Sequence, residues 1–215
     1  MDLKWLPNAL TIARCLLAGV VLWSCWKASI QFSADTDASF ETRATLEHLW
    51  AQLALLAFVA GALTDLGDGV LARALNAHSR FGVWLDPIAD KLLIAGALVG
   101  LWLMIGGLAL AIPALIIIAR DIGMTMLRMT RLGQSTVAVS AMAKWKTTLE
   151  MIAIAALLVP LALAPREAEP ATLASSPGPI AILLVGLLWI AAALSVYTAL
   201  QYLVAALREN GNDRA

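Results

Sequence analysis

Four aspartates at short, regular intervals are the residues of this sequence best suited to chemistry. Asp65 and Asp68 are spaced i, i+3, and Asp86 and Asp90 are spaced i, i+4. On two helices each pair would share one helical face, so the four carboxylates could converge on one volume. At membrane depth their repulsion and desolvation must be offset by cations. Oxygen-only ligand sets favour hard divalent ions, Mg²⁺ first and Mn²⁺ or Ca²⁺ as alternatives, and such ions usually serve phosphate chemistry.

The composition indicates that these acids belong to an integral membrane protein. Of the 215 residues, 61% are hydrophobic and 14% are charged, and the mean hydropathy is +0.82, which is far from the balance of a soluble domain. The formal net charge is zero, with 15 basic and 15 acidic residues. A chain without an excess of basic residues is not expected to bind nucleic acid. Its apolar surface is expected to contact membrane lipids.

Apolar segments of roughly 20 residues, each long enough to cross a bilayer, organise the chain. They predict one all-α domain over residues 1–215 with six transmembrane helices at about 8–27, 46–72, 82–104, 108–131, 144–163 and 180–207. Asp65 and Asp68 would lie near the end of the second helix, and Asp86 and Asp90 near the start of the third. Both pairs would therefore reach the same membrane face.

The segments between and within the spans carry three further expectations. Residues 28–45 are polar and predict a loop, whereas Gly106 and Gly107 predict a tight turn. Gly96 and Gly100 are spaced i, i+4 and predict a close contact with a neighbouring helix.

The distribution of basic residues predicts the orientation. With both termini inside, every lysine and arginine except Lys27, Arg43 and Arg166 lies on or near the inner half of the chain. Cytoplasmic loops of membrane proteins carry such an excess of positive charge. The acidic site is therefore expected to face the cytoplasm.

The aspartates are part of a longer pattern with fixed glycine, alanine and arginine positions. In this sequence the pattern reads Asp65-x2-Asp68-Gly69-x2-Ala72-Arg73-x8-Gly82-x3-Asp86-x3-Asp90. It resembles the signature of the CDP-alcohol phosphatidyltransferase family, and every fixed position of that signature is present. The resemblance implies an enzyme of the inner (cytoplasmic) membrane with a bundle of six helices, which tends to form a homodimer.

The resemblance also implies roles for the acids. Asp65, Asp68, Asp86 and Asp90 would hold Mg²⁺ or Mn²⁺, with two ions expected, and the metal would take the diphosphate of a CDP-linked lipid. Asp90 would in addition be the catalytic general base that takes a proton from the acceptor hydroxyl. The alternative is that these acids only pair with basic neighbours, which are Arg73, Arg80 and Lys91.

The remaining motif residues would shape the site for the CDP-lipid, together with Asp65 and Asp68. Gly69 and Gly82 remove side chains where a nucleotide or phosphate must approach helix backbone, and Ala72 keeps the same face shallow. Arg73 follows Gly69 by four residues, so it shares that face and its fork suits a phosphate oxygen or the cytosine edge.

Residues outside the motif indicate which alcohol is the acceptor substrate. Asp90 is followed by Lys91, which is similar to the phosphatidylglycerophosphate and cardiolipin synthase branches of the family. The segments 6–11 with Arg14, 118–121 and 135–147 are similar to phosphatidylglycerophosphate synthases. Two positions depart from them, namely Asp121, where glutamate is usual, and Ala143, where glycine is common.

A dianionic acceptor such as glycerol 3-phosphate requires cations, and Arg120, Lys144 and Lys146 are available to bind its phosphate. Arg120 could instead pair with Asp121 or lipid headgroups, and the two lysines could be membrane anchors. Further residues that could shape the nucleotide or acceptor entry are Asn8, Thr11 and Arg80, although Asn8 is also a natural helix cap.

The resulting prediction is transfer of the phosphatidyl group of CDP-diacylglycerol to sn-glycerol 3-phosphate, giving phosphatidylglycerophosphate and CMP. The nearest alternative is the same chemistry with another acceptor, either phosphatidylglycerol, to give cardiolipin, or inositol phosphate. An intramembrane prenyltransferase would require a second acidic motif on other helices, and a divalent-cation transporter would require acids along a path through the membrane. Neither feature is evident.

Overall fold

The computed structural model describes residues 6–33, 40–75, 80–129, 141–163 and 178–212. At some positions in these ranges, among them 66–75 and 80–84, only the backbone is described. The described residues form six helices and no strand, namely α1 (Leu6–Ser33), α2 (Phe40–Leu75), α3 (Arg80–Ile105), α4 (Leu108–Met129), α5 (Ala141–Leu163) and α6 (Pro179–Asn212). The predicted all-α class with six membrane-spanning helices is confirmed.

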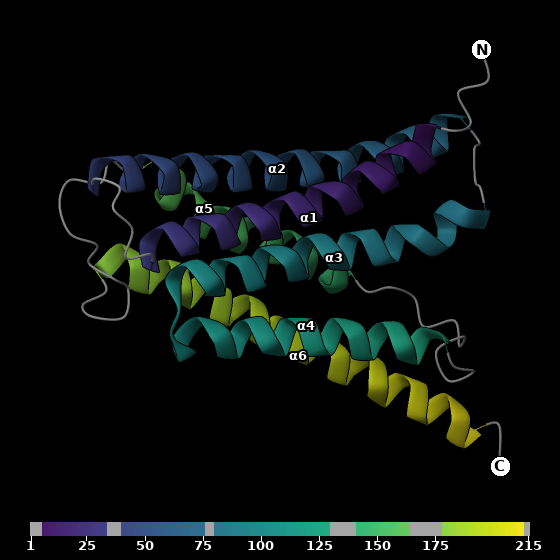
Figure 1. The fold of residues 1–215 in the computed structure, drawn as a ribbon. Coiled ribbons are helices and arrows are strands. Elements are labelled where there is room, and N and C mark those ends of the chain that lie inside the picture. Colours follow the sequence, from purple (N-terminus) through teal and green to yellow (C-terminus); the bar gives the residue numbers. More distant parts are fainter. Residues whose placement is uncertain (1–5, 34–39, 76–79, 130–140, 164–177, 213–215) are drawn as a thin grey trace.

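Successive helices run in opposite directions through one bundle (Figure 1). All six are long and apolar enough to cross a membrane, and only 22% to 39% of each span is buried inside the protein. The rest of the apolar surface faces outward, as expected where lipid replaces water as the solvent. The starts of α1, α3 and α5 and the ends of α2, α4 and α6 therefore gather at one end of the bundle.

The helix α1 packs between α2 and α3, while α5 contacts α2, α3 and α6, and α4 contacts α3 and α6. Small residues allow the close approach of α1 and α3. A Cβ atom at Gly100 would lie 2.7 Å from Cβ and 2.8 Å from Sγ of Cys25, and one at Gly96 would lie 3.1 Å from the backbone oxygen of Ala18. The predicted close contact at Gly96 and Gly100 is confirmed, and its partner is α1.

The turn predicted at Gly106 and Gly107 is also confirmed, because both residues adopt positive φ angles, of 73° and 80°, which glycine alone tolerates easily. The polar loop predicted for residues 28–45 is wrong at both ends, since α1 continues to Ser33 and α2 begins at Phe40. Hydropathy marks where a chain leaves the membrane, but helical hydrogen bonding continues beyond that level. Glu41 in the first turn of α2 favours the helix N-terminus electrostatically.

Candidate active site

The aspartate motif lies at the end of the bundle where α2 ends and α3 begins (Figure 1). The backbone carries Asp68, Gly69, Ala72 and Arg73 in the last turns of α2, and Arg80, Gly82 and Asp86 in the first turns of α3. Only the backbone of these seven residues is described. Of the four motif aspartates, Asp65 and Asp90 have described side chains.

Asp65 is held by a cation from a different helix. Arg14 of α1 places Nη1 2.9 Å from Oδ1 of Asp65, and the arginine side chain is 1% exposed whereas the aspartate side chain is 38% exposed. A buried guanidinium is costly unless an anion meets it. The pair therefore ties α1 to the end of α2 and leaves the aspartate accessible from outside the bundle.

Asp90 lies one residue before Lys91, whose Nζ is 3.5 Å from Asp90 Oδ2. The other carboxylate oxygen, Oδ1, is buried and accepts no hydrogen bond from the described residues. An orphaned buried carboxylate oxygen is costly unless a cation or a proton donor reaches it. Asp90 is thus suited to bind a metal ion or to accept a proton from a substrate.

The chemistry of these carboxylates fits a hard divalent cation, since Mg²⁺ prefers oxygen ligands and is commonly bound by one or two carboxylates together with substrate phosphates. Among the described side chains, no group of three or more His, Cys, Asp or Glu residues could hold a metal ion. Asp68 and Asp86 lie outside that set, so the four-aspartate metal site stays a prediction.

A second group of charges is centred on Asp121 of α4 and includes residues of α3 and α5. We call Lys91, Arg120, Asp121, Lys146 and Glu150 the Asp121 cluster. Lys91 Nζ donates to Asp121 Oδ2 at 2.8 Å, while Arg120 Nη1 and Lys146 Nζ donate to Oδ1 at 3.0 Å and 2.5 Å. One carboxylate thereby joins cations from α3, α4 and α5.

Arg120 is also fixed by the last helix. Its Nε donates to the backbone oxygen of Ser195 at 3.0 Å, and its Nη2 donates to Oγ1 of Thr198 at 3.0 Å. These bonds attach α4 to α6 and set the plane of the guanidinium. Arg120 is therefore preorganised and loses little side-chain freedom when it binds an anion.

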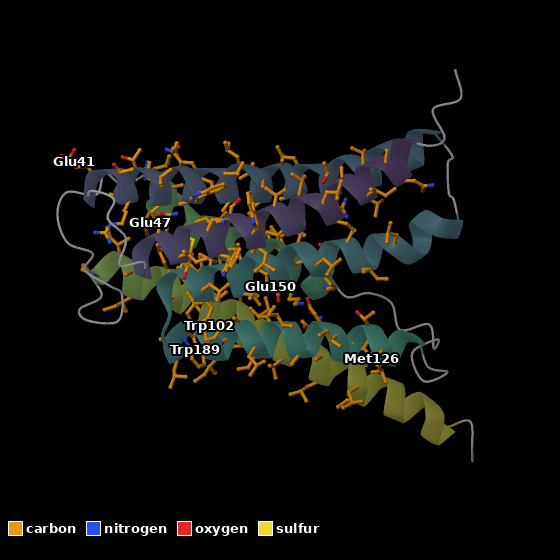
Figure 2. All side chains as sticks on the ribbon, in the orientation of Figure 1. Glu41, Glu47, Trp102, Met126, Glu150 and Trp189 are labelled. Atoms are coloured by element: carbon orange, nitrogen blue, oxygen red, sulfur yellow. The ribbon has the colours of Figure 1, made fainter. Side chains whose placement is uncertain are left out.

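Lys146 forms the most buried part of the Asp121 cluster together with Glu150. Its Nζ lies 3.1 Å from Glu150 Oε1, and the two side chains are 2% and 0% exposed. Figure 2 shows Glu150 within the bundle and away from the helix ends. A buried ion pair of this kind is strongly destabilised when one partner is removed, because an uncompensated charge is left behind.

The structure brings together two of the three predicted acceptor-site cations, Arg120 and Lys146, whereas Lys144 lies outside the described side chains. The alternative that Arg120 pairs with Asp121 is confirmed, although that pair does not exclude phosphate binding.

Thr11 is buried in α1. Asn8 is inside the first turn of α1, which begins at Leu6, so it does not cap the helix.

Three residues that contact the cations of the Asp121 cluster were not assigned a role from the sequence. Glu150 could have been found, because it follows Lys146 by four residues and such pairs meet on a helix. Ser195 and Thr198 carried no comparable signal. Their part depends on how α6 packs against α4.

Comparison with known proteins identifies the family to which the chain belongs. The sequence model described as CDP-alcohol phosphatidyltransferase matches residues 4–197, which is most of the chain. The chain belongs to the CDP-alcohol phosphatidyltransferase family.

Curated relatives agree in name. The protein called CDP-diacylglycerol--glycerol-3-phosphate 3-phosphatidyltransferase in Salmonella choleraesuis (strain SC-B67) is 39% identical over 165 residues, covering 75% of this chain and 82% of the relative. A protein of the same name in Escherichia coli (strain K12) is 40% identical over 156 residues, covering 71% of this chain and 78% of the relative.

Proposed function

We propose that the protein transfers the phosphatidyl group of CDP-diacylglycerol to sn-glycerol 3-phosphate, producing phosphatidylglycerophosphate and CMP. Membership of the family and the names of the relatives support this reaction. The observation that carries the acceptor is the Asp121 cluster, in which Lys91, Arg120 and Lys146 meet one buried carboxylate. Cations of this number suit a phosphate group, and an uncharged alcohol would not require them.

In the reaction, the carboxylate of Asp90 accepts the proton of the glycerol 1-hydroxyl, and the oxygen attacks the lipid-side phosphorus of CDP-diacylglycerol. The phosphorus–oxygen bond to the CMP group breaks, and CMP leaves with the bonding electrons. Asp65, Asp68, Asp86 and Asp90 would hold Mg²⁺ or Mn²⁺, with two ions proposed. When bound, these ions neutralise the diphosphate and the charge that develops on the leaving CMP.

The nucleotide and the acceptor would be held by different groups of residues. Gly69, Ala72, Arg73 and Gly82 would accommodate the CDP group near the ends of α2 and α3. Arg120 would contact the acceptor phosphate, with Lys146 adding its charge from the buried side and Lys144 nearby in sequence. The sequence shows no serine, cysteine or histidine motif that suggests a covalent intermediate, and the proposed path is direct displacement.

The protein is a multi-pass membrane protein, and we propose that the aspartate end of the bundle faces the cytoplasm from the inner membrane. The excess of lysine and arginine at that end supports this orientation. A homodimer remains part of the proposal.

The test is release of CMP by the purified protein from CDP-diacylglycerol with a panel of acceptors, with and without Mg²⁺. Glycerol 3-phosphate is the expected acceptor, and chelation of Mg²⁺ is expected to stop release. If phosphatidylglycerol or inositol phosphate replaced glycerol 3-phosphate as the productive acceptor, the chemistry would stand and the acceptor would be wrong. Metal-independent release, or no release with any acceptor, would overturn the proposal.

A further inference from the structure

The Asp121 cluster and Asp90 form one connected series of charges, which becomes more buried from Lys91 through Asp121 and Lys146 to Glu150. The connections run from Asp90 through Lys91 to Asp121, and from there to Arg120 and Lys146, which meets Glu150. The exposed fractions of the side chains are 28% for Lys91, 19% for Asp90, 14% for Arg120, 4% for Asp121, 2% for Lys146 and 0% for Glu150.

This gradient separates cations that a substrate can touch from one that it cannot. Lys146 is enclosed and lies between the carboxylates of Asp121 and Glu150. Lys91 and Arg120 are the two cations of the cluster with exposed surface. The buried part contains two carboxylates and one lysine, and the Asp121 carboxylate contacts both accessible cations.

Both accessible cations retain hydrogen-bond donors within the described contacts. A lysine ammonium has three N–H groups, and Lys91 uses one of them on Asp121. A guanidinium has five, and Arg120 uses three, on Asp121, Ser195 and Thr198. Asp121 holds both head groups. Because both side chains keep exposed surface, their remaining donors are open to an incoming anion.

The position of Lys91 next to Asp90 suits a short acceptor. The two charged groups lie 3.5 Å apart, and glycerol 3-phosphate has its phosphate and its reacting hydroxyl at opposite ends of three carbons. A cation that holds the phosphate beside the carboxylate that takes the proton keeps the hydroxyl in reach of the base.

We propose that Lys91 binds the phosphate group of the acceptor together with Arg120, and that Lys146 acts as buried support. The proposal rests on the proposed function and adds a residue that determines acceptor specificity. A phosphomonoester is the group recognised, because two cations held by one carboxylate suit its two negative charges.

The test compares Lys91→Gln, Lys91→Arg and the control Lys27→Gln, whose lysine lies over the rings of Trp23 and Trp26 on α1. For Lys91→Gln we expect the KM for glycerol 3-phosphate to rise at least about tenfold, while the KM for CDP-diacylglycerol changes less than about threefold. Lys91→Arg should recover most of the loss because it keeps the charge, and Lys27→Gln should match the unaltered protein.

A binding measurement without turnover completes the test. Glycerol 3-phosphate should raise the melting temperature of the detergent-solubilised protein, and Lys91→Gln should require at least about tenfold more ligand for the same rise. If Lys91→Gln does not fold, Lys91→Met repeats the comparison with an uncharged side chain of similar length.

The outcomes separate this inference from the proposed function. An unaltered protein that releases no CMP with glycerol 3-phosphate would remove the function and the inference together. An active protein in which Lys91→Gln leaves the KM for glycerol 3-phosphate unchanged would remove only the inference. A fall in kcat alone would mean that Lys91 acts through Asp90, and an equal rise of both KM values would mean that it has a structural role; either result overturns phosphate binding.

Discussion

Arg14 and Asp65 form an ion pair of 2.9 Å between α1 and the end of α2. The arginine is buried and the aspartate, which is the first residue of the motif, is half-exposed. One oxygen of the carboxylate is thus oriented by the protein itself. Support of a ligand by a neighbouring side chain is common at metal sites and usually affects metal affinity.

We predict that Arg14→Gln weakens metal binding, because the Asp65 carboxylate loses the partner that orients it. The half-saturating Mg²⁺ concentration for CMP release should rise about tenfold, which corresponds to the loss of one charge-assisted hydrogen bond. Binding of Mn²⁺ to the substrate-free protein should weaken in parallel. Arg43→Gln, at the opposite end of α2, is the control, and an unchanged Mg²⁺ requirement in Arg14→Gln would contradict the predicted role.

Replacement of Asp90 by asparagine should abolish turnover and leave binding of the CDP-lipid largely intact. The amide keeps the size of the side chain but cannot accept the proton of the acceptor hydroxyl, and loss of a general base costs roughly 100-fold to 10,000-fold in rate. Single-turnover CMP release and equilibrium binding of CDP-diacylglycerol measure the two effects separately. Near-normal activity in Asp90→Asn would rule out the assigned role.

The buried pair of Lys146 and Glu150 should show strong coupling in a double-mutant cycle. Lys146→Met and Glu150→Gln should each lower thermal stability, because each leaves a buried charge with one partner fewer, and breaking a buried pair costs about 3–5 kcal/mol. The double variant should lose less than the sum of the two single variants. Melting temperatures in detergent check this, and additive losses would show that the two side chains do not interact.

The contact between α1 and α3 should make Gly100 intolerant of a side chain. In Gly100→Ala the new Cβ would lie within 2.8 Å of Cys25, and overpacking of this kind costs about 1–3 kcal/mol. Gly123 of α4 is the matched control, since a Cβ there would meet nothing within 4 Å and alanine favours a helix by up to about 1 kcal/mol. Thermal unfolding should therefore separate the two variants in opposite directions, and equal stability would contradict the close contact.

The sequence by itself determined the six helices and the end of the bundle at which the aspartate motif lies. Apolar runs of membrane length predicted all six helices, because a helix is the local way for a spanning segment to satisfy its backbone in lipid. The spacing of Asp65 and Asp68, and of Asp86 and Asp90, together with the direction of the spans, placed the acids at one end. Helix ends beyond the membrane, as at Ser33 and Phe40, were missed because hydropathy does not report them.

The tertiary structure alone decided which charges meet. Arg14 and Asp65 lie on different helices, and Arg120 reaches a backbone oxygen 75 residues later in the chain. Local spacing determines which face of a helix a residue occupies, but its partner depends on how each helix is rotated and packed against its neighbours. For that reason the aspartate motif could be read from the sequence, whereas the convergence of Lys91, Arg120 and Lys146 on Asp121 became evident only in the folded bundle.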